Sequence, residues 1–247
     1  MIRAMIFDLD GTLVQTERLK ALSYARAVTE ICPEAVSEQA VFEAFKDVVG
    51  LSRREVALAL IERFDLEAQA AARMAEFGVE TPWQALVQIR LRYYEDLLAD
   101  PDILRDNQWP HNVELLHTAR RNGCKTGLAT MSYCAQVQRV LAILDLAGAF
   151  DFVASSDDVE HGKPDPEIYQ LVSTELGVPP QECLVIEDSP SGVKAALAAG
   201  MWCIAVTTPF TLASLRAANL LEERWIVDDP ATLMVVVESM LVERTQD

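Results

Sequence analysis

The stretch Ile6-Phe7-Asp8-Leu9-Asp10-Gly11-Thr12-Leu13 decides the fold class of this chain, because an apolar run ends in it and two acids follow. Apolar residues that lead into a glycine are typical of a buried strand running into a turn. Asp8 and Asp10 then lie at the carboxyl edge of the strand, where open α/β sheets bind their ligands. Two carboxylates this close repel each other unless a cation or a proton lies between them. The stretch therefore predicts a site for a hard metal ion, a nucleophile, or both.

From about residue 107 onward, strand and helix patterns alternate along the chain. We expect strands at 126–130, 150–155, 183–187, 202–207 and 225–227. We expect helices between them at 112–122, 133–144, 166–176, 191–199 and 212–218, and a final helix at 231–242. Alternating β and α units imply a doubly wound parallel sheet with helices on both faces, which is an α/β fold of the Rossmann-like type.

The segment from residue 15 to about 106 is helical in pattern, and Pro33, Gly50, Gly78 and Pro82 punctuate it. We therefore predict an α/β core domain formed by residues 1–14 and 107–247, and an all-helical cap domain formed by residues 15–106. An insertion directly after the first strand would lie above the ligand-binding edge of the sheet, as a lid would. The alternative is that these helices only extend the fold.

Composition excludes several classes of function. The chain has 247 residues, 51% of them hydrophobic, and a formal net charge of −17. That charge argues against a nucleic-acid partner, because phosphate backbones need a basic protein face. No apolar run is long enough to cross a bilayer. Five scattered cysteines and three distant histidines favour reduced thiols in a cytoplasm over a disulfide framework or a zinc hydrolase site.

Chemistry-bearing residues follow four of the expected strands. The four groups are the acid pair Asp8 and Asp10 with Thr12; Thr130 with Met131 and Ser132; Lys163 within the stretch 162–166; and the acid pair Glu187 and Asp188 with Ser189 and Gly192. Each group alone also has a plain structural reading, such as a solvated turn, a loop lysine or a helix cap. Their common placement at strand ends indicates one shared site.

The residue types in these groups are those that phosphoryl transfer needs. An aspartate carboxylate can attack phosphorus, and a second carboxylate can pass a proton to the leaving oxygen and later take one from water. Oxygen ligands at strand ends suit Mg²⁺. A threonine hydroxyl and a lysine can hold phosphoryl oxygens and neutralise their charge.

Taken together, the motifs resemble those of the haloacid dehalogenase superfamily, in the branch with a small helical cap after the first strand. The chain is similar to its phosphoglycolate phosphatase and β-phosphoglucomutase-like members. The D-x-D-G-T motif begins here at Asp8, the second-motif hydroxyl is Thr130, the third-motif lysine is Lys163, and the fourth motif begins at Glu187. The resemblance spans nearly the whole chain.

The resemblance implies a catalytic role for each of four residues. Asp8 would be the nucleophile that becomes an aspartyl phosphate, and Asp10 the general acid and base. Thr130 and Lys163 would hold the phosphoryl group, with Lys163 also paired to Asp8. The resemblance likewise implies a Mg²⁺ cofactor held by Asp8, by the main-chain carbonyl of Asp10 and by Asp188.

Within the same resemblance, Glu187 would support the metal directly or through water. Candidate substrate-binding residues next to the core motifs are Thr12, Met131 and Ser132. Those in the helical segment are Lys20, Gly50, Ser52 and Arg53.

The turn that contains Gly50, Ser52 and Arg53 resembles the substrate loop of β-phosphoglucomutase-like proteins. The planar fork of Arg53 suits a second phosphate or a carboxylate on the substrate. The alternative is that Ser52 caps a helix and that Arg53 pairs with Glu55 or solvent. Many sugar-phosphate members have histidine where this chain has Lys20, and that histidine is associated with the mutase cycle.

Three hypotheses for function follow. The first is a Mg²⁺-dependent phosphatase, a phosphoric monoester hydrolase that acts on a small phosphorylated metabolite such as a sugar phosphate. The alternative is a β-phosphoglucomutase-type mutase that uses the same aspartyl phosphate. A third is a phospho-acceptor or binding module without turnover. Asp10 argues against dehalogenase and phosphonate-cleaving branches, which lack the second acid. We expect a cytoplasmic protein, a monomer or a weak homodimer.

Overall fold

The computed structural model describes residues 1–49, 51 and 53–243, and the chain forms two compact units. One unit combines Met1–Gln15 with Leu104–Asp247, and the other is Thr16–Ile103. The first unit is thus built from two segments that are distant in sequence. Each unit is described by itself below.

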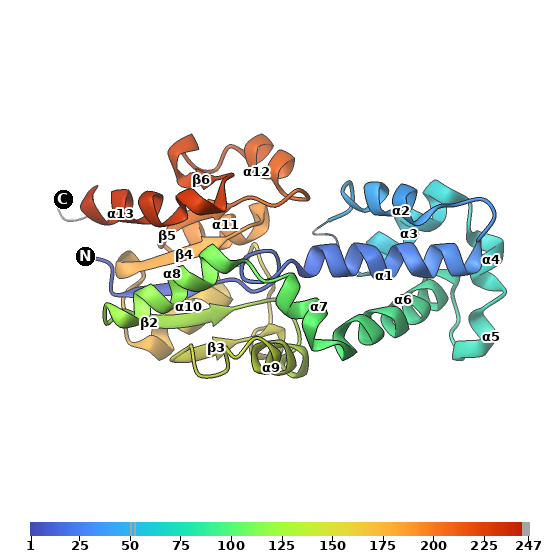
Figure 1. The fold of residues 1–247 in the computed structure, drawn as a ribbon, viewed down its shortest axis with the longest axis horizontal. Helices are drawn as coiled ribbons and strands as arrows, with labels where there is room; N and C mark the ends of the chain where they lie inside the picture. The colour runs from blue at the N-terminus through green and yellow to red at the C-terminus, as the bar shows by residue number, and fades with distance from the viewer. Residues whose placement is uncertain (50, 52, 244–247) are drawn as a thin grey trace. The chain divides into compact units, whose positions relative to one another are not determined.

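A six-stranded sheet forms the centre of the first unit, with the strand order β3-β2-β1-β4-β5-β6 and every neighbouring pair parallel (Figure 1). Its strands are β1 (Ala4–Phe7), β2 (Lys125–Ala129), β3 (Phe152–Ala154), β4 (Cys183–Glu187), β5 (Trp202–Val206) and β6 (Ile226–Val227). The predicted α/β fold with a doubly wound parallel sheet is confirmed.

Strand β1 is central and completely buried, because both its edges are paired and both its faces are covered. In register, Phe7 lies beside Leu128 of β2 and Ile186 of β4. Parallel strands covered on both faces are near-continuous apolar runs, as β1 and β4 are. Gly127 of β2 allows a helix to approach closely, since a Cβ there would lie 2.4 Å from Val172 Cγ1.

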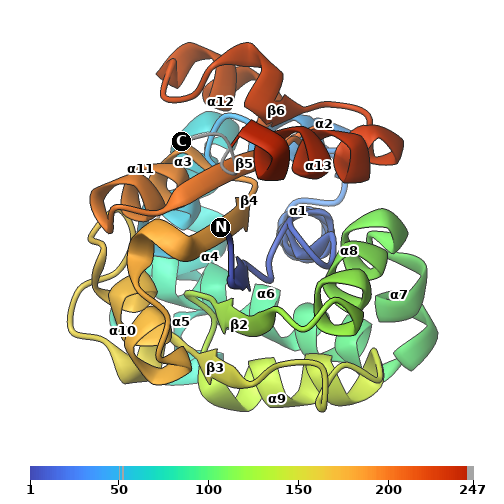
Figure 2. The same ribbon diagram turned by 90° about the vertical axis from the view of Figure 1, so that its left-hand side faces the viewer.

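Helices cover both faces of the sheet, and Figure 2 shows α10 and α11 on one side and α8 and α13 on the other. The helices of this part of the chain are α7 (Pro101–Asp106), α8 (Pro110–Arg121), α9 (Cys134–Ile143), α10 (Glu167–Leu176), α11 (Pro190–Ala198), α12 (Leu212–Ala218) and α13 (Leu233–Glu243). Short 3₁₀ turns lie at Ser156–Asp158, Pro180–Glu182, Glu223–Trp225 and Pro230–Thr232.

The second unit is a helical bundle. Its helices are α1 (Thr16–Ile31), α2 (Glu38–Phe45), α3 (Arg53–Phe64), α4 (Glu67–Ala71), α5 (Met74–Phe77) and α6 (Pro82–Ala99). Helix α6 packs against α1, α3, α4 and α5, so it forms the centre of the bundle. Thr81 and Gln84 form a capping box at its first turn, and Pro82 occupies a position where a helix needs no N–H donor.

The boundaries of β3 differ from the expected strand at 150–155. The strand begins later because the Asp151 carboxylate accepts the Thr126 N–H at 2.8 Å, which a strand carbonyl would otherwise accept. It ends earlier because the Asp158 carboxylate accepts the Ser155 N–H at 2.8 Å and turns the chain into a 3₁₀ helix. At both ends of β3, side-chain carboxylates thus accept main-chain N–H groups that would otherwise pair with the neighbouring strand.

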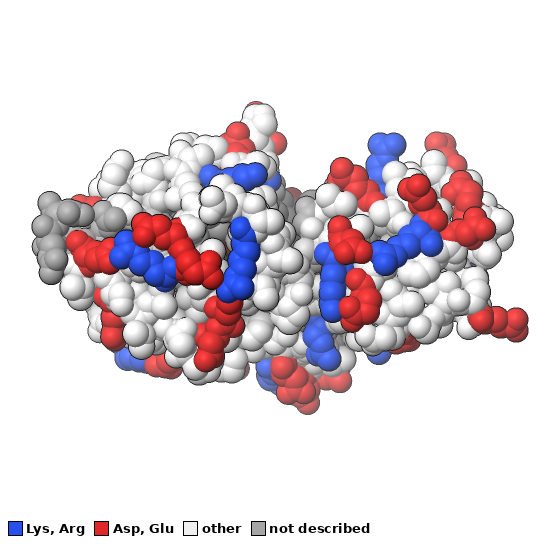
Figure 3. Space-filling view, turned by 90° about the horizontal axis from the view of Figure 1, so that it is seen from above, with Lys and Arg blue, Asp and Glu red and all other residues white. Residues whose placement is uncertain are grey.

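Charged side chains of both signs share the surface. On the face shown in Figure 3, Lys and Arg lie among Asp and Glu. Arg224, for example, pairs with Glu222 at 2.9 Å and with Glu243, and such exposed pairs contribute little to stability. In the described part of the chain, no helix combines the length and apolar character needed to span a membrane.

Candidate active site

Two acids follow the central strand. The Asp8 N–H donates to the Ile186 carbonyl of β4 at 3.0 Å, so Asp8 is held by the last hydrogen bond between the ends of β1 and β4. The side chain of Asp8 is buried, while that of Asp10 is partly exposed. Gly11 turns the chain with φ of 87°, a conformation that favours glycine. The structure therefore places Asp8 and Asp10 at the carboxyl edge of β1.

Lys163 makes three contacts from the loop that precedes α10. Its Nζ lies 2.7 Å from Asp8 Oδ1, 2.7 Å from Glu187 Oε1 and 2.9 Å from the Ala129 carbonyl. These three acceptors follow or end β1, β4 and β2, and they use all three N–H groups of the ammonium. Lys163 therefore ties the carboxyl ends of three neighbouring strands together, with a side chain that is only 5% exposed.

Glu187 accepts five hydrogen bonds. Its Oε1 accepts from Lys163 Nζ and from Tyr169 Oη, the latter at 3.1 Å. Its Oε2 accepts from the Asp188 N–H at 2.8 Å, the Ser189 N–H at 2.9 Å and the Ser189 hydroxyl at 3.0 Å. A carboxylate has about four lone-pair sites. Glu187 thus has no free acceptor for a metal ion in this arrangement, which differs from the metal-supporting role that the motif implies.

The first turn of α11 is shaped around that carboxylate. Ser189 caps the helix by accepting the Gly192 N–H at 3.0 Å. A Cβ on Gly192 would lie 1.6 Å from Glu187 Oε1, so a side chain at this position cannot coexist with Glu187 where it lies. Glycine at position 192 is therefore a steric requirement of the Glu187 site.

Burial sets the electrostatics of this cluster. Burial raises the pKa of Asp8 well above its usual range, and Glu187 and Asp10 act in the same direction against the opposing charge of Lys163. Burial also disfavours a charged Glu187, but Lys163 and the Ser189 donors outweigh it and lower the pKa of Glu187. For Lys163, the two carboxylates outweigh burial and raise the pKa above its usual value. Lys163 is therefore a permanent cation whose charge Asp8 and Glu187 share.

Hydroxyl groups surround the second acid. Asp10 Oδ2 accepts a hydrogen bond from Thr130 Oγ1 at 3.3 Å and another from the Ser132 hydroxyl. The Ser132 N–H donates to Thr130 Oγ1 at 3.1 Å, so the loop after β2 holds its two hydroxyls together. Hydroxyls that bind one carboxylate oxygen can equally bind a phosphoryl oxygen. Met131, between them, is exposed and lies against Gly162.

The carboxylates fit a small hard cation in their chemistry. Asp8 and Asp188 are both buried and directly follow the adjacent strands β1 and β4. Oxygen ligands from one or two carboxylates, completed by waters and substrate, are typical of Mg²⁺ sites. Across residues 1–49, 51 and 53–243, no three Asp, Glu, His or Cys side chains form a ready-made metal cluster. A site with two carboxylates and a main-chain carbonyl does not need one.

The structure does not bring every predicted residue into this cluster. Thr12 is fully buried near it in sequence, and its Oγ1 has no hydrogen-bond partner among the described residues. Lys20 and Arg53 belong to the helical unit, on α1 and at the start of α3. Gly50 and Ser52 lie outside the described residues. The roles of these five residues as substrate contacts stay predictions.

Sequence reasoning missed two buried polar residues, Tyr169 and Arg90. Tyr169 follows Lys163 by six positions on α10, and its spacing indicates an ordinary core aromatic. Arg90 interrupts the apolar side of α6 and is only 4% exposed. A charge within an apolar helical stripe is a signal that could have been used, because charged side chains are rarely buried unless paired.

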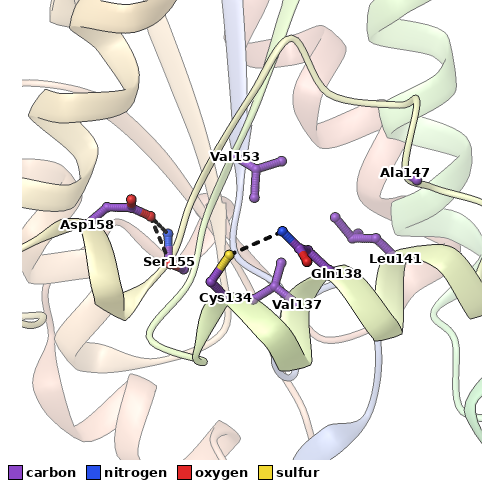
Figure 4. Close-up of a pocket in the computed structure, with 8 residues that line it drawn as sticks. All are labelled: Cys134, Val137, Gln138, Leu141, Ala147, Val153, Ser155 and Asp158. Carbon is purple, nitrogen blue, oxygen red and sulfur yellow. Dashed lines mark hydrogen bonds between the residues drawn. The ribbon is translucent and has the colours of Figure 1, made fainter.

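A separate pocket of about 300 Å³ lies between α9 and the end of β3 (Figure 4). Its polar groups satisfy one another, since the Gln138 amide contacts Cys134 Sγ at 3.4 Å and the Ser155 hydroxyl donates to Asp158 at 2.8 Å. None of the catalytic candidates lines this pocket. Its walls are mainly apolar and therefore do not suit a phosphoryl group.

Known proteins resemble the chain over most of its length. The family of haloacid dehalogenase-like hydrolases matches this chain over residues 2–200. A phosphorylated carbohydrates phosphatase from Thermotoga maritima is 31% identical over 201 residues, covering 81% of this chain and 82% of that protein. A phosphoglycolate phosphatase from Shigella boydii is 30% identical over 209 residues, covering 83% and 81%.

A solved structure of a β-phosphoglucomutase from Clostridium difficile covers 98% of this chain and 100% of its own with a TM-score of 0.66. At 22% identity, that likeness concerns the fold. The family match and the two phosphatase relatives agree with the motifs at the ends of β1, β2 and β4 and with the lysine that joins them. The chain belongs to the haloacid dehalogenase-like hydrolase family.

Proposed function

We propose that this chain is a Mg²⁺-dependent phosphatase that hydrolyses a small phosphorylated metabolite through an aspartyl phosphate. The observation that carries the proposal is the arrangement of Asp8, Lys163 and Glu187, in which one buried lysine joins two buried carboxylates at the carboxyl edge of the sheet. The phosphatase relatives support the same reaction class. Their named substrates support a phosphorylated carbohydrate or a short phosphorylated acid as the substrate class.

In the first step, a carboxylate oxygen of Asp8 attacks phosphorus and the bond from phosphorus to the leaving oxygen breaks. Lys163 orients the Asp8 carboxylate, and its charge opposes the rise that burial causes in the pKa of Asp8. The hydroxyls of Thr130 and Ser132 bind phosphoryl oxygens. Asp10 gives its proton to the leaving oxygen. In the second step, Asp10 takes a proton from the water that attacks the phosphorus, and the bond between phosphorus and Asp8 breaks to release phosphate.

The residues that would hold Mg²⁺ are Asp8, Asp188 and the main-chain carbonyl of Asp10. When bound, the ion neutralises charge on the carboxylates and on the phosphoryl oxygens. We assign Glu187 to Lys163 and to the turn after β4, because its acceptor sites are filled there. Five free cysteines support a reducing compartment, in which thiols do not form disulfides, and we propose the cytoplasm as the location.

The assay that tests this proposal is phosphate release from a panel of phosphorylated sugars and short organic acids, with Mg²⁺ or with EDTA. We expect release from a few substrates with Mg²⁺ and none with EDTA. The same wells should follow β-glucose 1-phosphate and its 6-phosphate product. Interconversion of the two without released phosphate would contradict hydrolysis and establish the mutase alternative.

The helical unit supports a second anionic group on the substrate, because it contains a buried cation, Arg90, that forms no ion pair with a carboxylate among the described residues. The Arg90 guanidinium lies 5.2 Å from the Tyr24 ring centroid and 4.4 Å from that of Tyr94. Within the described residues, its Nε has no hydrogen-bond partner. Burial lowers the pKa of Arg90 and the charge of Arg53 acts in the same direction, against the opposing effects of Tyr24, Tyr94 and Glu95. A buried guanidinium in such surroundings is stabilised by an anion.

Arg53 and Lys20 are close to the same place. Burial raises the pKa of the Tyr24 hydroxyl, and the charges of Arg90, Arg53 and Lys20 oppose that rise. The Tyr24 hydroxyl donates to the main-chain carbonyl of Arg53 at 3.3 Å, which ties the start of α3 to α1. We therefore assign Arg90, Arg53 and Lys20 to recognition of a carboxylate or second phosphate on the substrate.

Replacing the buried guanidinium tests this assignment. We expect Arg90→Met to raise KM about tenfold to a hundredfold for a substrate with a second anionic group, since an ionic hydrogen bond is lost. KM for p-nitrophenyl phosphate, which lacks that group, should not change. Thermal stability should stay equal or rise, because the variant removes a buried charge that has no ion-pair partner among the described residues.

Arg92→Met is the matched control on the same helix. Arg92 pairs with Glu30 on the surface of the bundle and is 45% exposed. Its replacement should leave both KM values unchanged. Equal effects of Arg90→Met on the two kinds of substrate would show that Arg90 has a structural role only.

A further inference from the structure

Tyr169 contacts two residues of the proposed catalytic cluster, Glu187 and Lys163. It belongs to α10, is completely buried, and donates its hydroxyl hydrogen to Glu187 Oε1 at 3.1 Å. The centroid of its ring lies 4.9 Å from Lys163 Nζ. One side chain thus contacts both partners of the ion pair that joins Lys163 to Glu187.

We propose that Tyr169 is a positioning residue, whose hydroxyl fixes Glu187 and whose ring supports Lys163 so that the ammonium is held against Asp8. The proposal rests on the proposed function, in which Lys163 orients the Asp8 carboxylate. Tyr169 does not itself contact the reacting atoms and acts only through these two residues.

The surroundings of Lys163 explain the need for the ring. The three N–H groups of the ammonium point to Asp8, Glu187 and the Ala129 carbonyl. An aromatic face is electron-rich and attracts a cation without competing for an N–H donor. The ring of Tyr169 therefore stabilises the buried charge and leaves all three hydrogen bonds intact.

The phenol oxygen needs a separate explanation, because phenylalanine would fill the same apolar space. Burying a hydroxyl costs free energy unless it finds a partner, and the partner here is Oε1 of Glu187. Burial and the Glu187 charge raise the pKa of Tyr169 well above its usual value, so the phenol stays protonated and acts as a hydrogen-bond donor. Oε1 then accepts from Lys163 and Tyr169 at once, which fixes the direction of the carboxylate.

Tyr169→Phe removes only the oxygen and keeps the ring beside Lys163. We expect kcat to fall about threefold to tenfold while KM stays the same, because the loss affects orientation of the nucleophile and not substrate affinity. Ser173→Ala is the matched control, since Ser173 is a buried residue of the same helix whose hydroxyl donates to the Val178 carbonyl at 2.7 Å. That variant should leave kcat and KM unchanged.

A double-mutant cycle shows whether Tyr169 acts through Glu187. In the Glu187→Gln background, adding Tyr169→Phe should lower kcat no further. An equal further decrease in that background would overturn the proposal, and so would an unchanged kcat in the single variant. The first result would mean that Tyr169 affects turnover by a route other than Glu187, and the second would leave Tyr169 as an ordinary core residue.

An activity-independent measurement separates this proposal from the proposed function. In protein labelled with [ζ-¹³C]tyrosine, the Tyr169 resonance is assigned by its loss in Tyr169→Phe. It should shift on Glu187→Gln, because an amide oxygen is a weaker acceptor than a carboxylate. An unchanged resonance would overturn the contact. If the wild-type protein released no phosphate from any substrate, the function would fail while the shift still reported the contact.

Discussion

Asp8→Asn is expected to lose at least about a thousandfold in kcat and to keep its fold, since no other group can replace the attacking carboxylate. Lys163 would retain Glu187 and the Ala129 carbonyl as acceptors. Burial already raises the pKa of Asp8, which means that the charged form is held at a cost. A neutral amide of the same shape should therefore leave thermal stability equal or higher. Phosphate release and thermal unfolding are the two measurements.

Asp228→Asn is the matched control for this prediction. Asp228 also follows a strand, β6, but its carboxylate accepts from Thr207 at 3.1 Å and from Arg216 on the surface. Its replacement should leave kcat unchanged. If Asp8→Asn kept more than a small fraction of the wild-type kcat, the assignment of Asp8 as nucleophile would be wrong.

Lys163→Met is expected to lose both turnover and stability. Without the ammonium, the buried carboxylates of Asp8 and Glu187 would face each other with no cation between them. Breaking a buried ion pair by removing one partner costs about 3–5 kcal/mol. Unfolding in urea should therefore show a decrease of that size in the free energy of unfolding, together with loss of phosphate release.

The double variant Lys163→Met with Glu187→Gln distinguishes charge from packing. Removing the uncompensated Glu187 charge should restore part of the lost stability without restoring turnover. A double variant as unstable as Lys163→Met alone would mean that the volume of the lysine matters more than its charge. Mg²⁺ should be absent from these unfolding experiments, because an added cation between the carboxylates would offset the loss.

The course of the chain through the sheet was predictable because it depends on local patterns. Strand patterns predicted β4 at Cys183–Glu187 with both ends correct, and they predicted β2, β3, β5 and β6 to within two residues at each end. The carboxyl-edge rule for α/β sheets then predicts Asp8, Asp10, Thr130 and the fourth-motif acids at one edge of the sheet. The apolar pattern of each strand and the parallel direction of the strands are enough to predict which residues lie at that edge.

The partners of the polar side chains depended on the tertiary structure. Lys163 contacts Asp8 across 155 positions and Glu187 across 24, and no local pattern determines which acceptors an ammonium meets. The family resemblance implied that Glu187 supports a metal ion. The structure engages it with Lys163, Tyr169 and the turn after β4, because packing of α10 and α11 brings those donors to it.

The same distinction explains Tyr169 and Arg90. Periodicity identifies which face of a helix is buried, and by that measure Tyr169 is only another apolar position of α10. Whether a buried hydroxyl or guanidinium has a partner depends on residues from other elements, here Glu187 from β4 for Tyr169 and the ring of Tyr24 from α1 for Arg90. The amino-acid sequence by itself determined the sheet and the edge where the acids lie, because the order of apolar residues within each short segment predicts which segments form buried strands. Which charges meet there was decided only by the packing of distant segments, because a hydrogen bond needs both partners in place.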